Sequence, residues 1–255
     1  MKVFRSIYLI INYKTFIITA LAVASTWLCD YYQLVANFPL TLVGIAIVFP
    51  VVFSIDSAYN RRERALALLA DFKAHFLVLY HASRDWLDRE DEEFSEKIKG
   101  KLIGIFDTLK LVFTSRNSSV SQKTIYDTIS DLSKSLQEFR ALGLQIGEMS
   151  RVDQYLSKMM VDIENLAGIL NYRTPITLRA YSKVFIYSFP ILYGPYFVHA
   201  ATDYSAGLEY MMPVVFSFIL VSLDNIQSHL ENPFDQIGED DIQFNVEEFE
   251  KLIKD

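Results

Sequence analysis

The chain has 255 residues, of which 51% are hydrophobic and 22% are charged, and its formal net charge is −7. This composition is too apolar for an ordinary soluble domain and too charged for a chain that lies wholly in lipid, so membrane and aqueous parts must coexist. The single cysteine, Cys29, excludes an intrachain disulfide and a cysteine-based metal site.

The first predicted membrane span covers residues 15–29, and the apolar region around it follows two basic residues, Lys2 and Arg5. Such a start resembles a signal peptide. Lys14 interrupts the apolar region, however, and no small-residue cleavage site is clear, so we interpret the segment as a retained anchor.

The second predicted span covers residues 38–55 and lies within 25 residues that carry no charge. A basic cluster follows Asp56, which is typical of a span with a cytoplasmic stop. Within this span Ile45, Phe49 and Phe53 recur every four residues and so share one face of a helix. From spacing alone such a stripe is more often a packing face than the lining of a pore. Pro50 lies inside it, and a proline in mid-membrane favours a face within protein over one against lipid.

Residues 61–172 contain none of the seven prolines, so long helices are permitted there. A polar stretch over 114–122 predicts a loop that follows one or more helices over 61–113. Two apolar repeats with helical spacing then predict two packed helices. They are Leu132, Leu136, Phe139, Leu142 and Ile146, and Val152, Leu156, Met159, Ile163, Leu166 and Leu170.

The third and fourth predicted spans cover residues 184–202 and 210–223. The fourth has only 14 residues before Asp224, which suits a helix shielded by neighbours. The connections between spans one and two and between spans three and four contain no lysine or arginine. By the positive-inside rule, both termini and the middle region are cytoplasmic.

No enzymatic constellation is present in the sequence. The four histidines (His75, His81, His199 and His229) have no metal-ligand spacing, and there is no glycine-rich phosphate loop or nucleophile elbow. We therefore do not expect an enzyme. Residues 224–255 contain ten acidic residues and two lysines, so the net negative charge comes from this final segment.

Several short pieces, taken together and in order, resemble the bestrophin family. Ala58-Tyr59-Asn60-Arg61 follows the Ile-x3-Phe-x3-Phe pattern at the family's distance. Further pieces are Arg173-Thr174-Pro175, the segment Met212 to Phe218, and Leu230-Glu231-Asn232-Pro233-Phe234 followed by Gly238-Glu239-Asp240-Asp241. The resemblance spans about residues 5–245. Two tryptophans that are common in the family after Tyr59 are absent here.

The resemblance implies an all-α integral membrane protein, a homopentamer with four membrane helices per subunit, a cytosolic helical vestibule and one pore on the fivefold axis. It also implies that Ile45, Phe49 and Phe53 form an apolar neck in that pore. Thr174 matches the position of a second constriction, the cytosolic aperture, where the family usually has an apolar residue. A threonine there suggests a wetter aperture.

Animal members of the family bind calcium through acidic side chains after Asn-Pro-Phe, together with carbonyl groups. Here Asn232 opens the motif, Asp240 matches one acidic residue and Gln243 replaces the other. Three residues are inserted at 235–237, and the chain starts too late to supply an N-terminal arm. Because calcium takes about six to eight oxygen ligands, several of them charged, we expect a degenerate site, no bound calcium and no other cofactor.

We therefore expect a channel of the inner (plasma) membrane that passes monovalent ions, with chloride or other anions favoured. Its expected partners are its own copies, lipid and ions, and not nucleic acid. Two alternatives stay open: a monovalent-cation channel of the same family, and a membrane-anchored sensor or scaffold. The expected regions are membrane helices 1 and 2 (1–60), a cytosolic helical region (61–172), membrane helices 3 and 4 (173–223) and an acidic cytosolic tail (224–255).

Overall fold

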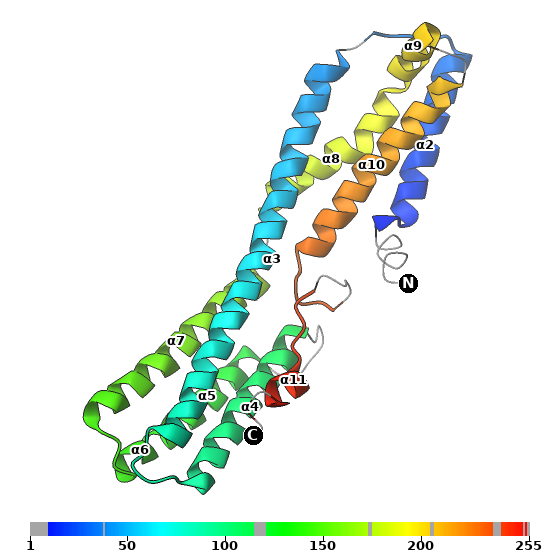
Figure 1. The fold of residues 1–255 in the computed structure, drawn as a ribbon. Helices are drawn as coiled ribbons and strands as arrows, with labels where there is room; N and C mark the ends of the chain where they lie inside the picture. The colour runs from blue at the N-terminus through cyan, green and yellow to red at the C-terminus, as the bar shows by residue number, and fades with distance from the viewer. Residues whose placement is uncertain are drawn as a thin grey trace. The chain divides into compact units, whose positions relative to one another are not determined.

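The computed structural model describes residues 10–37, 39–114, 121–172, 175–204, 207–236, 241–251 and 253, and these residues form helices joined by short connections (Figure 1). No strand occurs among them. The helices are α2 (Tyr13–Tyr31), α3 (Leu40–Asp85), α4 (Glu92–Thr114), α5 (Gln122–Leu136), α6 (Glu138–Ala141), α7 (Ile146–Asn171), α8 (Ile176–Leu192), α9 (Gly194–Tyr204), α10 (Leu208–Leu230) and α11 (Val246–Lys251). The all-helical fold class is therefore confirmed.

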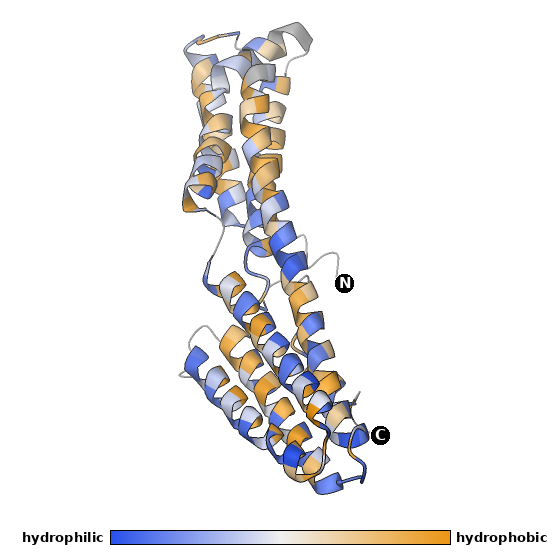
Figure 2. Ribbon diagram, turned by 90° about the vertical axis from the view of Figure 1, so that its left-hand side faces the viewer, coloured by the Kyte–Doolittle hydropathy of each residue, from blue (hydrophilic) through white to orange (hydrophobic). Residues whose placement is uncertain are grey.

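The chain divides into two compact units. Unit 1 comprises Met1–Arg62, Arg173–Asn232 and Ile237–Asp240, and unit 2 comprises Glu63–Tyr172, Pro233–Gln236 and Asp241–Asp255. Helix α3 contributes residues to both. Helices of unit 1 are largely apolar around their circumference, whereas those of unit 2 alternate hydrophilic and hydrophobic residues (Figure 2).

Unit 1 contains α2, the first part of α3, α8, α9 and α10. By length and composition alone, α3 and α10 are long and apolar enough to cross a membrane. A third span results if the helices that meet at Tyr193, which are bent by 46° there, are counted together as one span. Helix α2 covers the first predicted span, and the third predicted span falls on α8 and α9. Four membrane spans thus stay a prediction.

Small side chains bring α2 close to the α8–α9 corner. Ala22, Thr26 and Cys29 of α2 are buried, and Ser25 Oγ donates a hydrogen bond to the carbonyl oxygen of Ile191 at 2.7 Å. At Gly194 an added Cβ would lie 3.0 Å from Ser25 Oγ and 3.3 Å from the Ser25 carbonyl carbon. Close approach of this kind is the usual way in which membrane helices associate, because packing replaces the hydrophobic effect there.

Hydrogen bonds between side chains link helices of unit 1 across long sequence separations. Tyr187 donates to Asp224 at 2.5 Å, which joins α8 to α10. Tyr210 of α10 donates to Asp30 of α2 at 3.1 Å. Asn12, which caps α2 by accepting from the backbone N–H of Lys14, also donates to Asn225 of α10. These bonds pair polar groups that an apolar environment would otherwise penalise, whereas the second carboxylate oxygen of Asp224 is buried without a partner among the described residues.

Unit 2 has a core built from the second part of α3 together with α4, α5, α7 and the segment that follows residue 241. Its fully buried aromatic side chains include Phe72, Phe76 and Phe106. Phe249 of α11 packs edge-on against Phe76, with ring centroids 4.6 Å apart, and Phe244 lies in the same cluster. The acidic final segment therefore supplies apolar residues to a core.

The apolar repeat over 132–146 is not one helix, so that prediction was wrong. Leu132, Leu136 and Phe139 are buried as expected, but the chain turns after α6 at Gly143, whose φ is +88°. A left-handed φ of this kind ends a helix and favours glycine. Ile146 is consequently 91% exposed and begins α7. The second repeat is confirmed: within α7 Val152, Met159, Ile163 and Leu166 are buried.

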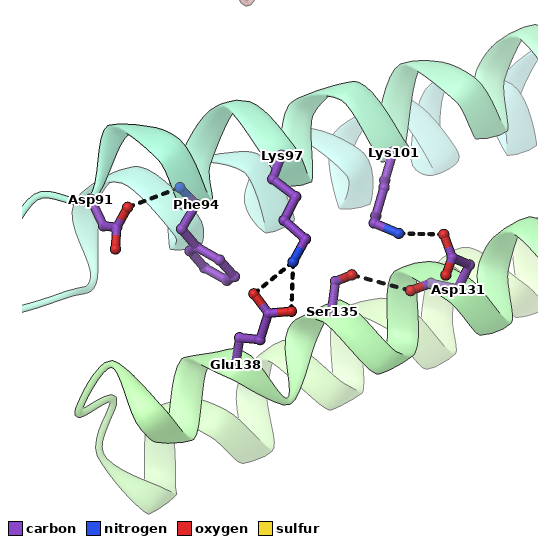
Figure 3. Close-up of polar contacts among 7 residues, drawn as sticks. All are labelled: Asp91, Phe94, Lys97, Lys101, Asp131, Ser135 and Glu138. Atoms are coloured by element: carbon purple, nitrogen blue, oxygen red, sulfur yellow. Dashed lines mark hydrogen bonds and ion pairs between the residues drawn. The ribbon is translucent and has the colours of Figure 1, made fainter.

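Two exposed ion pairs and a helix cap lie where α4 meets α5 and α6 (Figure 3). Lys97 contacts both carboxylate oxygens of Glu138 at 2.7 and 2.9 Å, and Lys101 pairs with Asp131. Asp91 caps α4 by accepting from the backbone N–H of Phe94 at 2.9 Å. Solvent-exposed ion pairs contribute only about 0–1 kcal/mol each. These two pairs therefore align α4 with α5 and α6 more than they stabilise the fold.

Candidate functional site

The face of α3 that carries Ile45, Phe49 and Phe53 is uncovered within the chain. These side chains are 50%, 57% and 60% exposed. The rings of Phe49 and Phe53 stack with centroids 6.1 Å apart and an angle of 27° between their planes. We call these three residues the neck face.

The opposite face of α3 is buried. Ile47 and Val51 are only 3% and 1% exposed, and they belong to the core cluster of unit 1 with Ile186, Phe189, Phe197, Leu220 and Val221. With about 3.6 residues per turn, residues 47 and 51 lie roughly opposite residues 45 and 49. The orientation of α3 is therefore fixed by packing on one side, which leaves large apolar side chains exposed on the other.

An acidic side chain continues the neck face by one turn. Asp56 follows Phe53 by three residues, is exposed, and accepts a hydrogen bond from Asn60 Nδ2 at 3.0 Å. At about 100° per residue, Asp56 and Asn60 fall on the same side of α3 as Ile45 and Phe49. In the sequence Asp56 was recognised only as the end of an apolar run, although helical spacing could have placed it on this face.

The nearest basic side chains on α3 are arranged differently. Arg61 and Arg62 are half-buried, and Arg64 is the first exposed arginine after Asp56. Eight residues separate Asp56 from Arg64, which corresponds to about 12 Å along a helix. Close to the neck face, the exposed charge is therefore negative.

The other predicted site residues are not brought together by the described part of the chain. Thr174 and Asp240 lie outside the described residues, Asn232 is half-buried in unit 1, and Gln243 is exposed in unit 2. The segments on either side of 237–240 meet through a bond from the N–H of Ile242 to the carbonyl of Pro233 at 2.8 Å. Among the described residues no three His, Cys, Asp or Glu side chains are grouped as metal ligands.

No protein-family model and no curated protein sequence matches the chain. Solved structures do match it over almost its whole length. A crystal structure of a bacterial bestrophin homologue from Klebsiella pneumoniae that carries one substitution has a TM-score of 0.79 at 15% identity, covering 94% of this chain and 96% of that one. A second variant of that homologue gives 0.78 at 16% identity over 98% and 96%. A crystal structure described as that of a membrane protein variant gives 0.81 at 16% identity over 94% and 95%. The chain thus has the fold of bacterial bestrophin homologues.

Proposed function

We propose that this chain, which has the fold of bacterial bestrophin homologues, is a membrane ion channel in which five copies place their neck faces around one narrow pore. The observation that carries the proposal is the two-sided character of α3. Ile47 and Val51 are buried in the core of unit 1, while Ile45, Phe49 and Phe53 remain exposed although they are large and apolar. An exposed apolar stripe of this size marks a contact surface or the lining of a pathway.

A ring of neck faces would control permeation through dehydration. Isoleucine and phenylalanine side chains offer no hydrogen bonds to replace the water around an ion. Partial dehydration costs less for large, weakly hydrated monovalent ions than for small or divalent ones. We therefore expect a passive pathway for monovalent ions that strongly disfavours divalent ions.

Selectivity between anions and cations depends on two opposing features of α3. Phenyl rings presented edge-on are electropositive at the rim, which favours anions. Asp56 is exposed on the same face one turn beyond Phe53, and five copies would form an acidic ring that concentrates cations. The resemblance on its own implies anions. The position of Asp56 is the specific observation that favours the cation-selective alternative, and we propose that alternative as the second candidate.

The remaining features of the proposal follow from the sequence. The distribution of basic residues supports a multi-pass protein of the inner (plasma) membrane with both termini in the cytosol. Thr174 is proposed to line the cytosolic aperture. We propose that Asn232, Asp240 and Gln243 bind no calcium, because Gln243 supplies no charge where a second acid is needed.

Reversal potentials measured on the purified protein in a planar bilayer test the proposal. Replacing sodium by a large organic cation should shift the reversal potential if Asp56 sets selectivity. Replacing chloride by a large organic anion should shift it if the phenyl rings do. No current in either condition would contradict the channel itself, and so would a monomeric or dimeric particle in detergent instead of five copies of the 29.4 kDa chain.

A further inference from the structure

A groove of about 810 Å³ runs between α2 and α10 in unit 1. Small side chains of α2 form much of its wall, including Ala20, Val23 and Ala24, and Val214 and Phe218 line it from α10. Almost every group that lines the groove is apolar, so water gains no hydrogen bonds there. A hollow of this kind in a membrane-spanning unit suits a hydrocarbon chain.

The length of the groove matches one leaflet of a bilayer. Ile11 and Trp27 line its two ends, with Thr15 near the first, and the twelve residues of helix from Thr15 to Trp27 span about 18 Å. Half of the hydrocarbon core of a bilayer is about 15 Å thick. Trp27 also stacks on Tyr31, which in turn contacts Tyr32 edge-on, so the end of the groove away from Lys14 is aromatic.

Polar groups lie at the opposite end of the groove. Thr15 is 3% exposed, and its hydroxyl has no hydrogen-bond partner among the residues that the structure describes. Lys14, the residue before Thr15, does not line the groove itself, is half-buried and forms no ion pair with any described residue. A buried hydroxyl without a partner is costly, so a ligand with acceptor oxygens at this end would be stabilised.

We propose that the α2–α10 groove binds one acyl chain of an anionic phospholipid, with the phosphate and ester oxygens near Lys14 and Thr15. This inference rests on the proposed function only for the membrane location of unit 1. A second copy of the chain fits the groove less well, because an apolar helix of that copy would leave the Thr15 hydroxyl without a hydrogen-bond partner. Lysine also complements the phosphate charge, which an apolar helix of another copy does not.

Phospholipid retained by the purified protein tests this site. The protein is purified in detergent, incubated with dioleoylphosphatidylglycerol, separated from free lipid and analysed by native mass spectrometry. We expect about one retained lipid per chain, because each chain contributes one α2–α10 groove. Ala24→Phe fills the groove at an exposed position and should reduce retention by roughly fivefold or more.

Leu21→Phe is the matched control, because Leu21 is 48% exposed on α2 and does not line the groove. It should retain lipid as the unaltered chain does. Lys14→Gln should weaken retention of phosphatidylglycerol about fivefold and leave dioleoylphosphatidylcholine little changed. Equal lipid retention by Ala24→Phe and Leu21→Phe would overturn the proposal. A smaller assembly mass of Ala24→Phe with unchanged lipid content would also overturn it, because the groove would then hold another copy of the chain. Ion flux is measured separately, so loss of flux with lipid retained contradicts only the channel.

Discussion

The guanidinium of Arg179 donates a hydrogen bond to the carboxylate of Glu231 at 2.7 Å, and this ion pair joins the first turns of α8 to the residue that caps α10. The Glu231 side chain is only 5% exposed and that of Arg179 is 24% exposed. Both ends of the contact therefore lie largely away from water, where a charge needs a partner.

Removing the arginine should consequently destabilise unit 1. We expect Arg179→Met to lower the free energy of unfolding by about 3 kcal/mol, because the buried carboxylate loses its cationic partner. The thermal midpoint of the detergent-solubilised protein measures the effect. Arg151→Met is the control, since Arg151 pairs with Glu148 on the exposed surface of α7, and it should change stability by less than about 1 kcal/mol. Similar losses in both variants would argue against the role of burial.

Shortening the neck face should increase ion flow. In the double variant Phe49→Ala and Phe53→Ala, the constriction loses its largest apolar groups, so the dehydration barrier falls and we expect conductance to rise roughly twofold or more. Single-channel recording measures this change. Leu21→Ala removes an exposed apolar side chain from α2 instead and should leave conductance as it was. Unchanged conductance in the double variant would exclude the neck face as the narrow part of the pathway.

Neutralising Asp56 should change selectivity without changing the fold. Asp56→Asn keeps an acceptor for the hydrogen bond from Asn60 but removes five negative charges from the proposed ring. The permeability ratio of cations to anions should fall by roughly fivefold. Bi-ionic reversal potentials at low ionic strength measure the ratio, because salt screens such a ring. A ratio identical to that of the unaltered channel would show that selectivity is set elsewhere.

Gly194 should tolerate no larger side chain without movement of α2. A Cβ at this position meets Ser25 and Cys29 at 3.0 to 3.3 Å, so we expect Gly194→Ala to destabilise the protein by about 1–3 kcal/mol. Gly104 in α4 is the matched control, since a Cβ there would meet nothing within 4 Å. Gly104→Ala should stabilise its helix by about 1 kcal/mol. Thermal midpoints that move in the same direction for both would contradict the close contact.

Two acidic residues of unit 2 should give opposite dependences of stability on pH. Burial raises the pKa of Asp162, although the hydrogen bond from His75 opposes this shift. The neutral carboxyl group of Asp162 therefore makes its full contribution to stability below about pH 3.8, and this contribution is lost as the pH rises through the raised pKa. Lys101 lowers the pKa of Asp131, so that contribution is present above about pH 3.8 and is lost as the pH falls through the lowered pKa.

Thermal midpoints of Asp162→Asn and Asp131→Asn, compared with the unaltered chain between about pH 3 and 7, test the two signs. Relative to the unaltered chain, Asp162→Asn should gain stability as the pH rises, because the buried carboxylate no longer ionises. Asp131→Asn should lose stability relative to the unaltered chain over the same rise. Parallel curves for the two variants would refute the assignment.

Apolar periodicity and charge distribution were sufficient to predict helices in the middle of the chain and apolar segments at both α3 and α10, whereas the all-helical fold class followed from the family resemblance. They were insufficient at Ile146, because a repeat of apolar residues continues across the turn at Gly143 and only the backbone shows the break. They also did not indicate that α3 continues to Asp85, since a charge cluster ends a membrane span without ending a helix. The neck face was predictable by spacing, whereas its exposure depended on which side of α3 packs against α8 and α10.

The contribution of Phe244 and Phe249 to the core of unit 2 has a consequence for biosynthesis. These residues are translated after α8, α9 and α10, whereas Phe76 and Phe106, against which Phe249 packs, emerge from the ribosome before those helices. A nascent chain must therefore carry an incomplete aromatic core throughout synthesis of the intervening segment. Exposed apolar surface of this kind recruits chaperones and promotes aggregation. Unit 2 is consequently the part of the protein that depends most on the last stage of translation.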